Sequence, residues 1–129
     1  MADTLSPILS EADEARITAV MDRLSEDGVR LATAESCTGG ILASLFTDVP
    51  GRSHIFEAGF VTYSDDAKTA MLGIPAAVIA RHGAVSREVA TAMVEGALRH
   101  CKADLALAVT GFAGPGNDGE EAGLVHFAC

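Results

Sequence analysis

Hydrophobic positions recur along the chain with two different spacings. Some segments place them every three or four residues, which indicates one face of a helix, and others are short, nearly continuous apolar runs, which indicate buried strands. The clearest helical face combines Ile17, Val20, Met21 and Leu24. The predicted helices cover about residues 10–28, 41–46, 64–73, 76–82 and 86–102, and the predicted strands cover 29–34, 55–63, 104–110 and 124–129.

Local signals mark the ends of several of these elements. Ser10, Ser64 and Ser86 stand where a hydroxyl can cap a helix, and Gly28 and Gly83 stand where a helix can stop. Helices that alternate with short apolar strands predict an α/β protein. We expect a three-layer α/β/α sandwich, with helices on both faces of a mainly parallel, possibly mixed, sheet. Residues 1–9 are interpreted as a lead-in and residues 10–129 as a single domain.

Composition and charge narrow the classes of partner. Hydrophobic residues make up 49% of the 129 residues, which is enough for a core, while aromatic residues are 5% and Trp is absent. We therefore expect a core of Ala, Val, Leu and Ile. The net charge of −9 disfavours nucleic acid as a partner, because an acidic surface repels phosphate backbones. A small phosphorylated ligand stays possible, since one local positive site can hold a phosphate.

Cysteine usage and the chain's beginning indicate the compartment. Cys37, Cys101 and Cys129 are few, odd in number and without C-x-x-C spacing, which argues against a disulfide framework or a zinc cluster. The sequence shows neither a basic and apolar leader nor an apolar run of roughly 18 residues. We expect a cytoplasmic protein that uses no metal and contacts no membrane.

The segment Ala34–Gly40 is the first candidate for chemistry. It places Ser36 at a strand-to-helix turn, where Gly39 and Gly40 permit a tight turn and close approach of a ligand. The N–H groups that open the following helix could stabilise an oxyanion or bind a phosphate. Two alternatives stay open: Ser36 could be only a helix cap, and Cys37 is a rival nucleophile because a helix N-terminus lowers a thiol pKa.

A serine nucleophile needs a base, and the chain contains only two lysines. Lys102 is interpreted as structural, at the end of a long helix. Lys68 falls in the first turns of its helix, where the dipole and partial burial would both lower its pKa. Tyr63, the one tyrosine, could relay a proton or orient Lys68. The alternatives are a solvated lysine, a strand aromatic, or His126 as the base; none of the four histidines has metal-ligand spacing.

A second glycine-rich segment, Thr110–Gly116, directly follows a predicted buried strand. Ligands of parallel α/β sheets bind beyond the carboxyl ends of strands. Ser36, Tyr63 and Thr110 each lie at such an end if the predicted strands are right. This convergence favours a site over the alternative of a flexible crossover loop.

Four segments together resemble the CinA carboxy-terminal domain family, over roughly residues 10–128. They are residues 34–40, residues 61–64 with 67–68, residues 81–86 and residues 109–115. The resemblance implies hydrolysis of nicotinamide mononucleotide to nicotinic acid mononucleotide and ammonia, without a metal or organic cofactor, in a homodimer. It implies Ser36, Tyr63 and Lys68 as the catalytic set, and it places at the ligand Thr38, Gly39, Gly40, Thr110, Gly111 and Gly114.

The resemblance also marks what differs here. Family members continue for a further strand and helix, so we expect the domain to be truncated at its C-terminal end in this sequence. The segment Glu120–Gly123 lacks the Lys-Pro pair that the family carries before its last strand. Two other functions are compatible with the same residues: a non-catalytic ligand-binding or interaction module, and hydrolysis of a different small amide.

Overall fold

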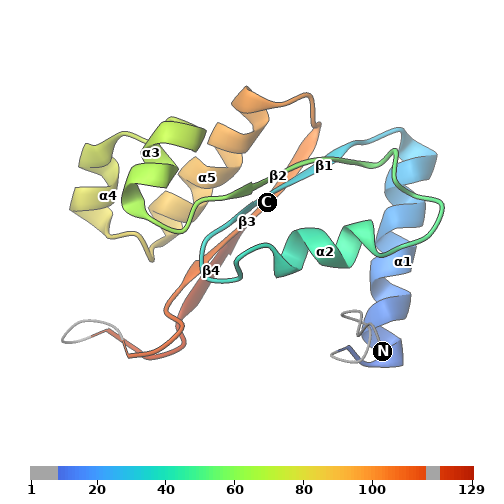
Figure 1. Ribbon diagram of the computed structural model, residues 1–129, viewed down its shortest axis with the longest axis horizontal. Helices are drawn as coiled ribbons and strands as arrows, with labels where there is room; N and C mark the ends of the chain where they lie inside the picture. Colours follow the sequence, from blue (N-terminus) through green and yellow to red (C-terminus); the bar gives the residue numbers. More distant parts are fainter. Residues whose placement is uncertain (1–8, 116–119) are drawn as a thin grey trace.

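The computed structural model describes residues 9–115 and 120–129. The predicted lead-in therefore lies almost wholly outside the described residues, as does the end of the second glycine-rich segment. Helices and strands alternate through most of the chain, as predicted (Figure 1). The elements are α1 (Glu11–Asp27), β1 (Leu31–Glu35), α2 (Ile41–Thr47), β2 (Phe56–Val61), α3 (Asp65–Leu72), α4 (Ala76–His82), α5 (Arg87–His100), β3 (Leu105–Gly111) and β4 (Val125–Ala128).

Serine caps begin three of the helices. The hydroxyls of Ser10, Ser64 and Ser86 each accept a hydrogen bond from the backbone N–H three residues later, which pairs a donor that the helix itself leaves unpaired. Gly28 and Gly73 end α1 and α3 in the left-handed conformation, with φ of 68° and 70°. The three predicted caps are therefore confirmed, and α3 is held at both ends.

The sheet has the strand order β2-β1-β3-β4 and is mixed. β1 is parallel to both neighbours, with Ala34 opposite Phe60 of β2 and Ala108 of β3. β4 is antiparallel to β3. The carboxyl ends of the three parallel strands thus meet at one edge, where β1 leads into α2 and β2 leads into α3.

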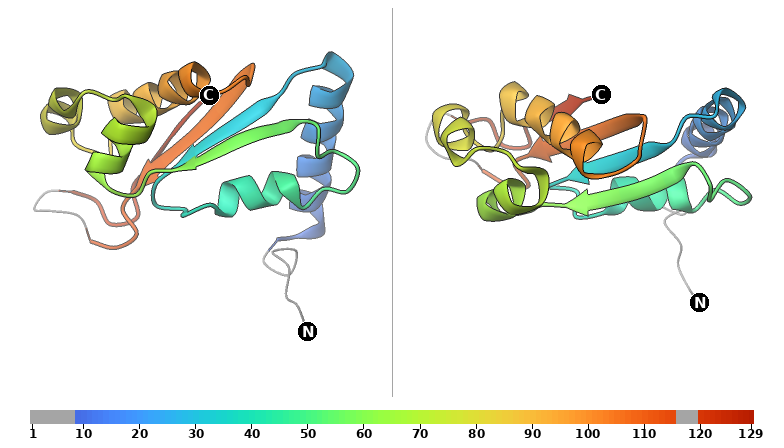
Figure 2. Two further views of the ribbon diagram at one scale, coloured as in Figure 1. Left: turned by 45° about the horizontal axis from the view of Figure 1, so that its top comes forward. Right: turned by 90° about the horizontal axis from the view of Figure 1, so that it is seen from above.

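Helices cover both faces of the sheet, so the predicted three layers are confirmed. One face packs against α3, α4 and α5, and its core consists largely of Ala, Val and Met side chains, Leu72 and two isoleucines. The other face packs against α1 and α2 through Met21, Leu24, Leu31, Phe46 and Ile55. Figures 1 and 2 show the sheet running between these two groups of helices.

Two expectations about buried faces need correction. Val20 is 47% exposed, because only Met21 and Leu24 of α1 are fully turned to the core. β2 is an edge strand whose side chains alternate between half-buried and exposed, so it is not covered on both faces as a continuously apolar strand would be. The strand β1, which lies between two neighbours, is buried at all five positions.

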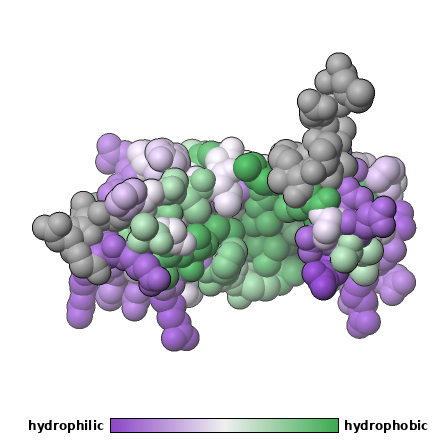
Figure 3. Space-filling model, turned by 90° about the horizontal axis from the view of Figure 1, so that it is seen from below, coloured by the Kyte–Doolittle hydropathy of each residue, from purple (hydrophilic) through white to green (hydrophobic). Residues whose placement is uncertain are grey.

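The layer formed by α1 and α2 leaves part of the sheet uncovered. Hydrophobic side chains gather in the middle of that face (Figure 3). A shallow apolar cavity of about 290 Å³ lies there, and Phe127 on its border is 76% exposed. Its lining comes from α2, β3 and β4 and the residue after β4: Leu42, Leu107, Ala108, Val109, Phe127, Ala128 and Cys129.

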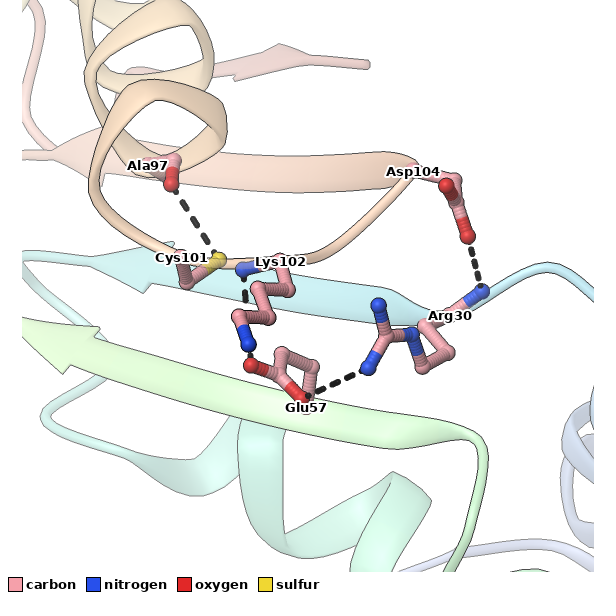
Figure 4. Close-up of polar contacts among 6 residues, drawn as sticks. All are labelled: Arg30, Glu57, Ala97, Cys101, Lys102 and Asp104. Atoms are coloured by element: carbon pink, nitrogen blue, oxygen red, sulfur yellow. Dashed lines mark hydrogen bonds and ion pairs between the residues drawn. The ribbon is translucent and has the colours of Figure 1, made fainter.

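Polar contacts join the strands at the end of the sheet where the parallel strands begin, which is opposite their carboxyl ends. Figure 4 shows Glu57 of β2 between the guanidinium of Arg30 and the backbone N–H of Lys102, each 3.4 Å from one carboxylate oxygen. The backbone N–H of Arg30 donates to Asp104 at 2.9 Å. Lys102 lies beyond the last residue of α5 and not within the helix as expected, but its position here agrees with a structural role.

Candidate active site

Ser36 immediately follows β1 and is held by the neighbouring strand. Its backbone N–H donates to the carbonyl of Val109 on β3 at 3.0 Å, which extends the parallel pairing by one residue. Its carbonyl accepts from the N–H of Gly39 at 3.2 Å, which closes a tight turn before α2. The side chain is buried, with 6% of the residue exposed. The hydroxyl is therefore presented from a fixed backbone at the carboxyl edge of the sheet.

Lys68 reaches this hydroxyl from α3. It is the fourth residue of that helix, and the ammonium Nζ lies 3.1 Å from Ser36 Oγ. The same Nζ donates to the carbonyl oxygens of Thr62 at 3.0 Å and Tyr63 at 3.3 Å. With 1% of the residue exposed, Lys68 is fully buried, so the structure excludes the solvated surface lysine considered above.

Burial shifts the pKa of Lys68. Removal from water lowers the pKa of its amine below the usual lysine range, while electrostatic interactions with Asp65 and Cys37 act in the opposite direction. Within residues 9–115 and 120–129 its hydrogen-bond partners are a hydroxyl and two carbonyls, with no carboxylate among them. A lowered pKa favours the neutral amine, which is the form that can accept a proton from Ser36.

Cys37 and His126 are the alternative nucleophile and base. Burial raises the pKa of the Cys37 thiol and outweighs a backbone hydrogen bond that lowers it, while the nearby Glu35 charge raises this pKa and Lys68 lowers it. The expected lowering of this pKa by a helix N-terminus is therefore wrong. His126 lies opposite Thr110 across β3 and β4, and the side chain that contacts Ser36 Oγ is Lys68.

Tyr63 contributes its backbone to the site. Its carbonyl accepts from Lys68, while the residue is 71% exposed and follows the end of β2. Among the described residues the phenol has no hydrogen-bond partner. A catalytic role of the phenol thus stays a prediction, and any such role would act on a bound substrate.

Glu35 is a site residue that the sequence reasoning missed. It is the last residue of β1, it is 0% exposed, and its carboxylate accepts hydrogen bonds from Thr38 and from the first turn of α2. The N–H groups of Leu42 and Ala43 are therefore occupied, and the expectation that this helix N-terminus is open to an oxyanion or phosphate is wrong in that respect. One signal was available: Gly40 at the cap of α2 has no side chain, so another acceptor was needed.

The predicted ligand residues of the first turn form its framework. The hydroxyl of Thr38 donates a hydrogen bond to the Glu35 carboxylate at 2.6 Å, and the N–H of Gly39 donates to the carbonyl of Ser36. Gly39 and Gly40 have φ of 61° and 111°, conformations that L side chains rarely adopt. The N–H groups of Thr38 and Gly40 donate to no backbone or side-chain acceptor among the described residues, so both are open to a ligand.

The predicted ligand residues of the second segment lie at the end of β3. The hydroxyl of Thr110 donates to the carbonyl of Ala84 at 2.8 Å and so joins β3 to the turn before α5. Gly111 lies against β4, where an added Cβ would approach Val125 Cγ2 to 2.7 Å. Gly114 lies in the exposed loop beyond, with open space around it. Their contact with a ligand stays a prediction.

No group of three or more His, Cys, Asp or Glu side chains within residues 9–115 and 120–129 could hold a metal ion. None of the helices in that part of the chain combines the length and apolar character needed to cross a bilayer.

Comparison with known proteins assigns the family. The CinA C-terminal domain model matches residues 13–129. A CinA-like protein of Akkermansia muciniphila is 53% identical over 109 residues, which are 84% of this chain and 26% of the relative. A CinA-like protein of Geobacter sulfurreducens is 50% identical over 123 residues, which are 94% of this chain and 30% of the relative. The chain thus spans less than a third of the length of these curated relatives.

Solved structures agree. A CinA superfamily protein from Escherichia coli superposes with a TM-score of 0.86 at 42% identity, covering 92% of this chain and 72% of that one. A competence/damage inducible protein from Agrobacterium tumefaciens superposes with a TM-score of 0.85 at 38% identity, covering 98% of this chain and 75% of that one. The chain belongs to the CinA C-terminal domain family.

Proposed function

We propose that this domain hydrolyses the carboxamide of nicotinamide mononucleotide to nicotinic acid mononucleotide and ammonia, as part of pyridine nucleotide salvage. The observation that carries the proposal is the buried amine of Lys68 at 3.1 Å from the hydroxyl of Ser36. A serine beside a neutral lysine is a known variant of the acyl-transfer triad. Family resemblance supports the choice of substrate and a homodimeric state.

The first half of the reaction forms an ester. Neutral Lys68 takes the proton of Ser36 as Oγ attacks the carboxamide carbon, which gives a tetrahedral intermediate. The free N–H groups of Thr38 and Gly40 would hold its oxyanion, and Tyr63 would assist proton movement at the exposed side. Lys68 then returns the proton to the leaving nitrogen, so that ammonia departs and an acyl ester remains on Ser36.

The second half uses water in the place of the serine. Lys68, neutral again, takes a proton from water as the water oxygen attacks the ester carbon. The bond to Ser36 Oγ breaks, Oγ regains its proton from Lys68, and the carboxylic acid product leaves. No redox step or cofactor is needed, because both halves are acyl transfers.

The test is ammonia release from nicotinamide mononucleotide by the purified chain, with nicotinic acid mononucleotide measured beside it. Ser36→Ala should abolish release, and the neighbouring Cys37→Ala, in the same turn, should retain it. Release that survives Ser36→Ala would show that another group is the nucleophile. A folded wild-type chain that binds the nucleotide without releasing ammonia would replace the amidase with a non-catalytic binding module.

A further inference from the structure

The Glu35 carboxylate accepts three hydrogen bonds beside the nucleophile, although none of them comes from Ser36 or Lys68. Oε1 accepts from the Thr38 hydroxyl at 2.6 Å and from the Leu42 N–H at 2.7 Å. Oε2 accepts from the Ala43 N–H at 3.0 Å. Both carboxylate oxygens therefore accept hydrogen bonds, and Glu35 is 0% exposed.

These contacts replace a missing cap. Helix α2 begins after Gly40, which has no side chain to accept from the second and third N–H groups of the helix. Glu35 accepts from those two groups, across the turn and from the end of β1. A buried, unpaired N–H is costly, so the carboxylate fixes where α2 starts relative to β1.

The nucleophile lies inside the loop that this carboxylate closes. Residues 36–40 are bounded by Glu35 on one side and by its partners Leu42 and Ala43 on the other. Thr38 is tied from the middle of the loop to the same carboxylate. Any shift of Glu35 would therefore change the direction in which the loop presents its side chains.

We propose that Glu35 is a positioning residue for the Ser36 nucleophile, because its carboxylate holds the turn in the one arrangement that brings Ser36 Oγ to Lys68 Nζ. The inference rests on the proposed function of the Ser36–Lys68 pair. Ser36 and Cys37 both lie in the loop that Glu35 closes, so loss of the carboxylate should also change the balance between these two nucleophiles. The negative charge of Glu35 acts in the same direction, because it helps to raise the pKa of the Cys37 thiol. Loss of the carboxylate should weaken Ser36 and favour Cys37.

The variants separate the effect of the hydrogen bonds that Glu35 accepts from the effect of its side-chain size. Glu35→Gln keeps the size but has one acceptor oxygen, so its NH₂ group must face an N–H or hydroxyl donor. Thr38→Val removes one donor and leaves Glu35 intact, while Thr38→Ser keeps the hydroxyl. Folding of Glu35→Gln is judged by circular dichroism. If this variant fails to fold, the comparison of Thr38→Val with Thr38→Ser tests the positioning role.

The measurement is covalent labelling, which does not depend on the substrate. Ser36 would be labelled with a fluorophosphonate and Cys37 with iodoacetamide, and the peptides quantified by mass spectrometry. Glu35→Gln should lower the Ser36 labelling rate on the order of 10- to 100-fold, as expected for a misplaced reacting group, and raise Cys37 labelling. Thr38→Val should lower Ser36 labelling, and Thr38→Ser should label faster than Thr38→Val.

The outcomes separate this inference from the proposed function. The positioning role would be overturned if folded Glu35→Gln kept the wild-type labelling rates and an unchanged Ser36-to-Cys37 labelling ratio. If Glu35→Gln does not fold, the same result in Thr38→Val would overturn it. Absence of ammonia release with labelling as expected would overturn the amidase and leave the positioning role standing. An unlabelled wild-type Ser36 would overturn both.

Discussion

Gly96 lies where α5 crosses the end of α3, and an added methyl group there has two opposed effects. A Cβ on Gly96 would clash with the carbonyl oxygen of Leu72 and lie 2.9 Å from the Cβ of Leu72. Helix propensity alone predicts that Gly96→Ala stabilises the fold by about 1 kcal/mol. Overpacking a core typically costs about 1–3 kcal/mol, and the upper end applies because a backbone carbonyl cannot rotate away. The net expectation is destabilisation by about 2 kcal/mol.

Urea unfolding followed by circular dichroism tests this expectation. With a slope of about 1–2 kcal/mol per molar urea, the midpoint of Gly96→Ala should fall by about 1–2 M. Glu95→Ala, at the exposed neighbouring position of α5, is the control and should stay within about 0.5 kcal/mol of wild type. A gain of about 1 kcal/mol in Gly96→Ala would refute the reasoning, because it would show that α3 and α5 separate without cost.

Further predictions concern the proposed catalytic pair and its neighbour. Lys68→Met should lower the rate of ammonia release about 10²- to 10⁴-fold, since it removes the base; an unchanged rate would contradict this. Burial lowers the pKa of Lys68 in the native chain. At pH values between this lowered pKa and the ordinary lysine pKa, Lys68 carries a proton in the unfolded chain that it lacks in the native chain. Wild-type stability should therefore rise with pH through that window, by up to about 1.4 kcal/mol per pH unit, and lose this contribution as pH falls; urea unfolding of Lys68→Met should lack the rise. Tyr63→Phe keeps the carbonyl that accepts from Lys68, so its loss of rate should be smaller than that of Lys68→Met.

Local chemistry made much of the fold predictable from the sequence. A serine cap acts within three residues and a glycine stop within one turn, so Ser10, Ser64, Ser86 and Gly28 could be assigned without tertiary information. The convergence of Ser36 and Tyr63 on Lys68 depends instead on sheet topology. Both follow the carboxyl ends of parallel strands, which lie at one edge of any such sheet.

What could not be predicted depends on how elements pack. The apolar spacing of α1 includes Val20, but which of its positions face the core depends on how α1 packs, which no local pattern encodes. The role of Glu35 needed the register of α2 against β1, because its partners Leu42 and Ala43 lie seven and eight residues ahead. An acidic residue before a serine is otherwise typical of an exposed turn, where a carboxylate remains hydrated.

The most direct test of the central claim is the titration of Lys68 by NMR on a chain with carbon-13-labelled lysines. The chain has only two lysines, and Lys68→Met identifies the Lys68 signal by removing it, which leaves Lys102 as the reference signal. We predict that Lys68 loses its proton well below the ordinary lysine value of about 10.4. A Lys68 that titrates at the ordinary value would be protonated at neutral pH, and the account of how Ser36 is activated would be contradicted.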